Sequence, residues 1–141
     1  MNAKKHLFFD MDHTITPARQ PIEEHMNTFL SELDTDIIVV SGSTVENMNV
    51  QVPDLGCYRL GQNGNQAFHI DGTALWDYKL SDSHRKEILA HIEKITALLD
   101  FVPNEEWNPT EDRGGQITFS PIGNTAPVEQ KKAYDPDAAK R

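Results

Sequence analysis

The chain has 141 residues, with 13 lysines and arginines against 22 aspartates and glutamates, and a formal net charge of −9. Its hydrophobic content of 38% is ordinary for one globular domain, and its acidity argues against a general nucleic-acid binder. The longest apolar run, 37–40, is far too short to cross a bilayer, and the amino terminus lacks the hydrophobic stretch of a signal peptide. The single cysteine, Cys57, excludes an internal disulfide and fits a reducing compartment. We therefore expect a cytoplasmic protein with neither a nucleic-acid nor a membrane partner.

The first sixty residues alternate between apolar strands and amphipathic helices. Short apolar runs at 7–9, 37–40 and 58–60 predict three buried strands. Apolar side chains recur at helical spacing over 22–33, and a Ser-x-x-Glu capping box at 43–46 predicts the start of a second helix. This alternation is typical of an α/β fold, in which right-handed crossovers connect parallel strands.

The pattern changes after residue 60. The turn signal Asp-Gly at 71–72 separates two segments, 67–70 and 73–76, which we expect to pair as a hairpin. Ser81 or Asp82 then has the properties of a helix cap, and a long amphipathic helix is predicted to follow.

The last sixty residues are more polar. Alternating side chains over 116–120 predict a half-buried strand, and we expect a loop or a frayed helix from residue 125 onward. The change in pattern predicts two regions, a sheet-and-helix core over 1–80 and a smaller layer over 81–141.

Two carboxylates stand where the first predicted strand ends. Asp10 and Asp12 are two residues apart, and ligands of open parallel sheets bind at this edge. One carboxylate of such a pair can attack phosphorus while the other gives or takes a proton. Two anions that face a phosphate repel it, so the arrangement requires a divalent cation such as Mg²⁺. A calcium-binding EF-hand loop is excluded, because its sixth and twelfth positions would be Ile15 and Pro21. A solvated turn without function stays open as the alternative.

A second polar segment follows the second predicted strand. Ser41 and Gly42 precede a predicted helix, where a hydroxyl and backbone N–H groups can bind phosphate. The plain alternative is that this segment only caps the helix through Ser43. Its position favours the first interpretation, because neighbouring parallel strands would deliver Asp10 and Ser41 to one edge.

Four ordered motifs resemble a known family. The segment at 9–20, Phe-Asp-Met-Asp-His-Thr-Ile-Thr-Pro-Ala-Arg-Gln, is similar to motif I of the haloacid dehalogenase superfamily, type IIB, and most of all to eukaryotic-type phosphomannomutases. Val-Ser-Gly-Ser at 40–43 resembles motif II, and Gln-Asn-Gly at 62–64 resembles the family's Glu-Asn-Gly turn. The segment at 113–123, which includes Ser-Pro-Ile-Gly, is similar to the cap of phosphomannomutases.

The resemblance implies a fold and a chemistry. The fold would be a Rossmann-like core, with a parallel sheet and helices on both faces, followed by the start of a type IIB α/β cap. The activity would be Mg²⁺-dependent phosphoryl transfer on sugar phosphates. Asp10 would be the nucleophile that forms an aspartyl-phosphate, and Asp12 the general acid/base. Asp10 would also bind the metal, Asp12 would touch it through its backbone carbonyl, and Ser41 and Gly42 would bind the transferring phosphoryl group.

Three further residues match substrate-binding positions of the family. Arg19 and Arg113 would hold the sugar phosphate, a role that suits the bidentate guanidinium, and Ser120 would bind substrate in the cap. Asn124 stands where phosphomannomutases carry an arginine, which favours a sugar-phosphate phosphatase over a mutase. The mutase stays open beside it.

The resemblance also implies a limit. The sequence printed here stops at residue 141, before the family's motif III lysine and motif IV acids, so it corresponds to an amino-terminal portion. A non-catalytic module that binds phosphate or a partner chain is therefore the alternative to an enzyme. The strand at 7–9 would form an exposed sheet edge, and we expect self-association, as a homodimer or by segment exchange, through that strand or the cap.

Overall fold

The computed structural model describes residues 5–17, 19–134 and 136. It divides into two compact units, Met1–Lys79 and Leu80–Arg141, each of which is described by itself. The elements of the first unit are β1 (His6–Asp10), α1 (Glu24–Ser31), β2 (Asp36–Val40), α2 (Val45–Gln51), β3 (Tyr58–Gly61), the 3₁₀ turn η1 (Gln62–Gly64), β4 (Gln66–Phe68) and β5 (Ala74–Asp77). Those of the second are α3 (Asp82–Thr96), the 3₁₀ turn η2 (Glu105–Trp107), β6 (Thr110–Asp112), β7 (Ile117–Phe119) and α4 (Val128–Tyr134).

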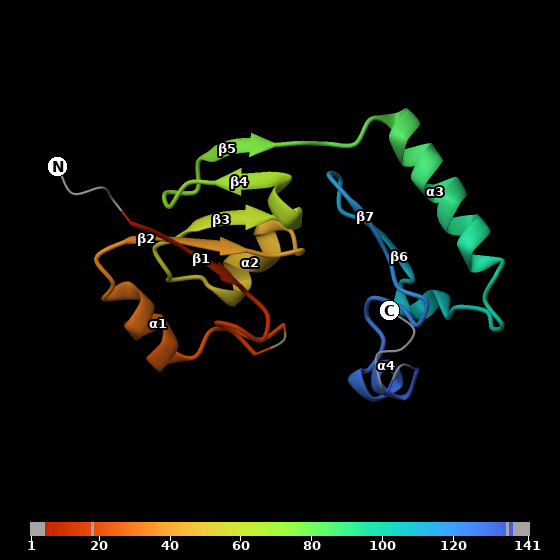
Figure 1. The fold of residues 1–141 in the computed structure, drawn as a ribbon, viewed down its shortest axis with the longest axis horizontal. Helices are drawn as coiled ribbons and strands as arrows, with labels where there is room; N and C mark the ends of the chain where they lie inside the picture. The colour runs from red at the N-terminus through yellow and green to blue at the C-terminus, as the bar shows by residue number, and fades with distance from the viewer. Residues whose placement is uncertain (1–4, 18, 135, 137–141) are drawn as a thin grey trace. The chain divides into compact units, whose positions relative to one another are not determined.

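The first unit contains a five-stranded sheet in the order β1-β2-β3-β4-β5, with the strands side by side in Figure 1. β1 pairs with β2 and β2 with β3 in parallel, whereas β3–β4 and β4–β5 are antiparallel. The predicted α/β fold, its parallel strands and its hairpin are confirmed. The sheet is mixed because the β4–β5 hairpin is added at the far side of β3.

The helices α1 and α2 pack against the same face of this sheet. Leu30 of α1 and Met48 of α2 join one hydrophobic cluster with Ile37 and Val39 of β2. The expectation of helices on both faces is not met within the described residues. The strand order gives the reason: β1, β2 and β3 advance in one direction, and right-handed crossovers that advance in one direction place their helices on one face.

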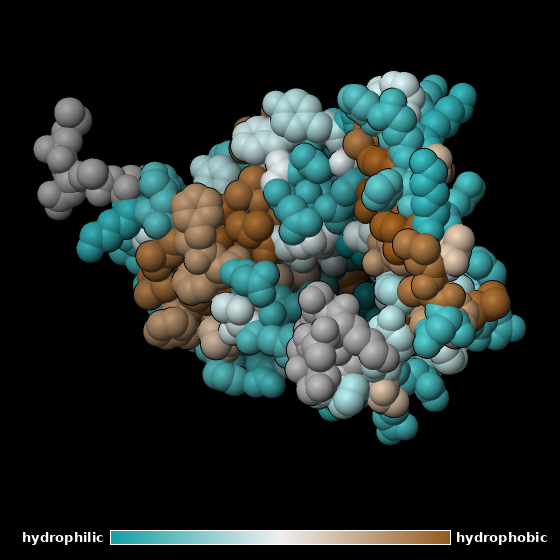
Figure 2. Space-filling view, turned by 45° about the vertical axis from the view of Figure 1, so that its right-hand side comes forward, coloured by the Kyte–Doolittle hydropathy of each residue, from teal (hydrophilic) through white to brown (hydrophobic). Residues whose placement is uncertain are grey.

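β1 lies at the edge of the sheet and keeps part of its apolar surface exposed. In the described residues it pairs only with β2. Phe8 is 67% exposed and Leu7 39%. Figure 2 shows hydrophobic surface close to where the chain begins. The predicted edge position of this strand is confirmed.

The second unit is a long helix with a two-stranded hairpin. Ser81 caps α3, because its side-chain oxygen accepts a hydrogen bond from the His84 N–H group. The hairpin pairs β6 with β7, and β7 contacts α3. β7 confirms the predicted strand, and α4 forms in the segment expected to be a loop or a frayed helix.

Cys57 is fully buried in the core of the first unit, where a cysteine behaves as a small apolar residue. Burial raises the pKa of its thiol, an effect that the charge of Arg59 partly offsets. Arg59 is itself buried and donates hydrogen bonds to the carbonyls of Val52, Leu55 and Cys57, which ties the loop before β3 to the strand.

Across the described part of the chain, none of the helices is long and apolar enough to span a membrane.

The core predicts the cost of one truncation. Met48→Ala removes a fully buried side chain from the cluster and should lower the free energy of unfolding by about 2–5 kcal/mol, measured by chemical denaturation. Val50→Ala in the same helix is the matched control. Val50 is 70% exposed, so its change should stay within about 0.5 kcal/mol. Equal losses in the two variants would contradict this packing.

Candidate functional site

Asp10 is the last residue of β1, and the strand register fixes its surroundings. It is paired with Val40, so Ser41 leaves the neighbouring strand at the same edge of the sheet. The Asp10 carboxylate is exposed, and the Thr14 hydroxyl donates to its Oδ2 atom over 3.4 Å. The structure therefore places Asp10 and Ser41, the first polar residues of the two predicted motifs, at one edge of the sheet.

The loop after β1 is anchored by its apolar members. Met11 is fully buried and Ile15 is 5% exposed. The Met11 carbonyl accepts hydrogen bonds from the N–H groups of Ile15 and Thr16, over 3.1 and 3.0 Å. Because successive side chains of an extended segment point to opposite sides, burial of Met11 turns Asp10 and Asp12 toward the outside of the core.

His13 enters the left-handed region, with φ of 63°. Its N–H group donates to the Thr16 carbonyl over 2.7 Å, which closes the loop. Histidine tolerates this conformation better than most side chains.

The Asp12 carboxylate is held by two donors. Its Oδ1 atom accepts from the Arg19 backbone N–H over 2.9 Å and from the Gln51 side-chain amide over 3.1 Å. Gln51 is the last residue of α2 and is 7% exposed. No motif singled out Gln51, and its position at a helix end is the single local signal. Among the described residues, no cation forms an ion pair with Asp10 or Asp12.

Ser41 is buried, and its loop is braced from two sides. Its N–H donates to the Leu60 carbonyl over 2.9 Å, and its carbonyl accepts from the Asn63 N–H over 2.9 Å. Its hydroxyl oxygen accepts from the Ser43 N–H over 3.1 Å and keeps its own proton to donate. Gly42 lies beside the Asn63 side chain, which a Cβ atom at Gly42 would meet at 3.6 Å.

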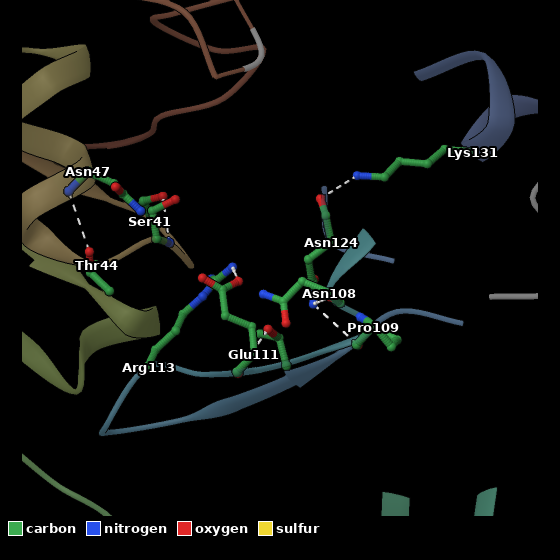
Figure 3. A network of polar contacts seen from close by, with 11 residues as sticks. Ser41, Thr44, Asn47, Asn108, Pro109, Glu111, Arg113, Asn124 and Lys131 are labelled. Atoms are coloured by element: carbon green, nitrogen blue, oxygen red, sulfur yellow. Dashed lines mark hydrogen bonds and ion pairs between the residues drawn. The ribbon is translucent and has the colours of Figure 1, made fainter. Parts of the chain in front are cut away.

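The cap of α2 is Thr44 rather than Ser43. The Thr44 hydroxyl accepts from the Asn47 N–H over 3.4 Å, as Figure 3 shows beside Ser41. The predicted capping box is therefore wrong by one residue. The Ser43 backbone carbonyl accepts from the Gln62 N–H over 2.7 Å.

Of the remaining predicted residues, one lies in the loop after β1 and two lie in the second unit. Arg19 is exposed, with φ of 55°, and its backbone binds Asp12. In the second unit, Arg113 forms an ion pair with Glu111 at 2.6 Å (Figure 3). The Ser120 hydroxyl accepts from the Gly123 N–H over 3.2 Å.

Asn124 is engaged within the second unit. Its side-chain amide donates to the Asn108 and Pro109 carbonyls, and its own carbonyl accepts from Lys131 over 2.7 Å (Figure 3). Its amide thus organises the loop around it, at the position where the resembled family has arginine.

A pocket of about 280 Å³ lies between the acid-bearing loop and the residues at the start of α1. It is lined by His13, Thr14, Ile15, Thr16, Pro17, Glu23, His25 and Met26. His25 pairs with Glu23 at 3.3 Å on its rim. Neither Asp10 nor Asp12 is among the residues that line it.

The donors at Asp10 and Asp12 suit Mg²⁺. Mg²⁺ is bound through one or two carboxylates, water and substrate phosphate, and both carboxylates here are free of ion pairs with described residues. Nowhere in 5–17, 19–134 and 136 do three His, Cys, Asp or Glu side chains gather to hold a metal by themselves. The described residues therefore offer oxygen ligands at Asp10 and Asp12 but no complete metal-binding cage.

Comparison with known proteins gives sequence relatives of one kind. No protein-family model matches the chain. Phosphomannomutase 1 of Dictyostelium discoideum is 30% identical over 138 residues, 90% of this chain and 54% of that protein. The phosphomannomutase of Saccharomyces cerevisiae is 27% identical over 139 residues, 92% of this chain and 54% of that protein. The phosphomannomutase of Spinacia oleracea is 29% identical over 137 residues, which are 90% of this chain and 54% of that protein. The chain thus spans about half the length of the curated relatives it matches.

Solved structures share the fold. A haloacid dehalogenase-like hydrolase from B. subtilis superposes with a TM-score of 0.57 and 16% identity, over 64% of this chain and 34% of that one. A phosphatase of the haloalkanoate (HAD) enzyme superfamily from Bacteroides thetaiotaomicron superposes with a TM-score of 0.55 and 12% identity. The match covers 65% of this chain and 36% of that one. At these identities the likeness concerns the fold.

The left-handed turn at His13 predicts a steric ranking. His13→Val places a β-branched side chain at positive φ and should lower the free energy of unfolding by about 1–2 kcal/mol. His13→Gly should change it by at most about 1 kcal/mol, because glycine adopts this conformation freely. Thermal and chemical denaturation of the two variants measure the difference, and equal stabilities would contradict the loop geometry.

Proposed function

We propose that the chain is a phosphomannomutase-like member of the haloacid dehalogenase superfamily and that it transfers phosphoryl groups on sugar phosphates through an aspartyl-phosphate on Asp10. The observation that carries the proposal is the placement of Asp10 and Ser41 at one sheet edge, with the Asp10 carboxylate exposed and outside any ion pair of the described residues. The relatives are phosphomannomutases, so a sugar phosphate is the substrate class that we propose.

The proposed reaction has two steps. A carboxylate oxygen of Asp10 attacks phosphorus and forms an acyl phosphate, while the bond from phosphorus to the sugar oxygen breaks and Asp12 gives that oxygen its proton. In the second step Asp12 takes a proton from water or from a sugar hydroxyl. The resulting oxygen attacks phosphorus and releases the Asp10 carboxylate. Water as acceptor gives a phosphatase, and a sugar hydroxyl gives a mutase.

Other residues of the chain bind the substrate in this proposal. The Ser41 hydroxyl has a proton left to donate to a phosphoryl oxygen, and Gly42 leaves room beside it. Arg19, Arg113 and Ser120 are proposed to bind the sugar phosphate, on the strength of the motifs they match. Mg²⁺, bound at Asp10 and Asp12, would neutralise charge that develops on the phosphoryl oxygens.

We propose that two copies of the chain associate through β1, by edge pairing or by segment exchange. An unpaired edge offers backbone donors and acceptors to another strand, and Phe8 adds exposed apolar surface beside it.

We also propose a cytoplasmic location. The single thiol of the chain, Cys57, is buried and forms no disulfide, which fits a reducing compartment.

Phosphate release from p-nitrophenyl phosphate with Mg²⁺ tests the enzymatic proposal. Asp10→Asn should abolish release, a loss of at least about 10²-fold, because an amide oxygen is a far poorer nucleophile than a carboxylate. Asp34→Asn, at an exposed aspartate that follows α1 in the chain, is the matched control and should keep the starting rate. Equal rates in Asp10→Asn and the unchanged chain would remove Asp10 as the nucleophile. Phosphate binding by a chain with no turnover would favour the binding module.

Sedimentation velocity tests the association. The chain should form dimers at micromolar concentration, and Phe8→Glu should shift it to monomers, because a charge on this strand opposes pairing. Val102→Glu is the control at a 91% exposed apolar residue of the second unit and should leave the dimer intact. A folded monomer at high concentration would overturn the proposal. Loss of the dimer in Val102→Glu alone would place the contact in the second unit.

A further inference from the structure

Among the residues that the structure describes, Gln51 is a buried side chain outside the recognised motifs that contacts a proposed catalytic carboxylate. Its Nε2 atom lies 3.1 Å from Asp12 Oδ1 and 3.4 Å from the Gln20 carbonyl. Its backbone carbonyl accepts from the Ile22 N–H over 2.7 Å. Gln51 thus links the end of α2 to Asp12 at one end of the loop after β1, and to Gln20 and Ile22 at its other end.

The two hydrogen bonds on Asp12 fall on the same oxygen. The Arg19 backbone and the Gln51 amide both donate to Oδ1, and no described residue donates to Oδ2. An oxygen that accepts two N–H bonds is a poor place for the proton of the neutral acid, because its lone pairs are occupied. Oδ2 is therefore the oxygen of Asp12 that the described donors leave unoccupied.

We propose that Gln51 is a positioning residue for proton transfer: it fixes the orientation of the Asp12 carboxyl group and selects Oδ2 as the oxygen that gives and takes the proton. The inference rests on the proposed function, because it assigns Asp12 the role of general acid/base. Gln51 acts through Asp12, and burial of its amide holds it in place without competition from water.

The test compares two substrates that differ in their need for an acid. The alkoxide leaving group of glucose 6-phosphate must be protonated as it departs, whereas the leaving group of 2,4-dinitrophenyl phosphate departs as a stable anion. Gln51→Leu should lower kcat about tenfold on glucose 6-phosphate and less than about twofold on 2,4-dinitrophenyl phosphate, with KM unchanged. Asp12→Ala should show the same dependence on leaving group, more strongly.

Two controls separate positioning from a structural role. Met48→Ala destabilises the same helix without touching Asp12, so it should affect both substrates equally. In the Asp12→Ala background, Gln51→Leu should cost nothing further, because the two side chains act as one unit. Equal losses on the two substrates, or additive losses in the double variant, would overturn the inference.

A spectroscopic measurement keeps the inference testable if the chain turns over neither substrate. The side-chain amide resonances of Gln51 in a ¹⁵N–¹H spectrum should shift in Asp12→Ala and stay in place in Asp34→Asn. Unchanged Gln51 resonances in Asp12→Ala would overturn the inference. Absence of turnover with the shift present would instead count against the proposed function.

Discussion

The parallel register of β1 and β2 is the constraint from which the rest of the site follows. Because Asp10 is paired with Val40, the polar residues after each strand begin at the same edge. Burial of Met11 then sets which way the acid-bearing loop faces, and the Leu60 and Asn63 backbones hold Ser41 beside it. A shift of one residue in this register would turn Phe9 out of the core and Asp10 into it.

Buried polar side chains organise the loops around that edge. Gln66 accepts from the Val45 N–H at the start of α2 and donates to Asp77, while Gln51 serves the other end of the helix. The bond between Gln66 and the Val45 N–H is buried, so loss of the Gln66 side chain leaves a desolvated N–H group at the start of α2. The seven-residue helix α2 is therefore fixed at both ends by side-chain amides, which explains how so short a helix can orient groups of the site.

Local sequence signals predicted the strands and the hairpin, because a buried strand needs a continuous apolar run and a tight turn needs residues such as Asp71 and Gly72. They missed β6, whose Thr-Glu-Asp sequence becomes a strand only by pairing with β7. They also missed Gln51, because its bond to Asp12 spans 39 residues and leaves no local pattern. The expectation of helices on both faces came from family resemblance, whereas the strand order alone dictates one face for α1 and α2.

The strand order also has a kinetic consequence. Every pair in the five-stranded sheet joins strands that are consecutive in the chain, and the separation of paired residues is greatest for β1, where His6 meets Asp36. The nearest pairings, within β3–β4–β5, close short loops, and loop closure becomes costlier with length. The hairpins should therefore nucleate folding and β1 should dock last, so the edge that carries Asp10 is completed only after the remainder of the sheet has assembled.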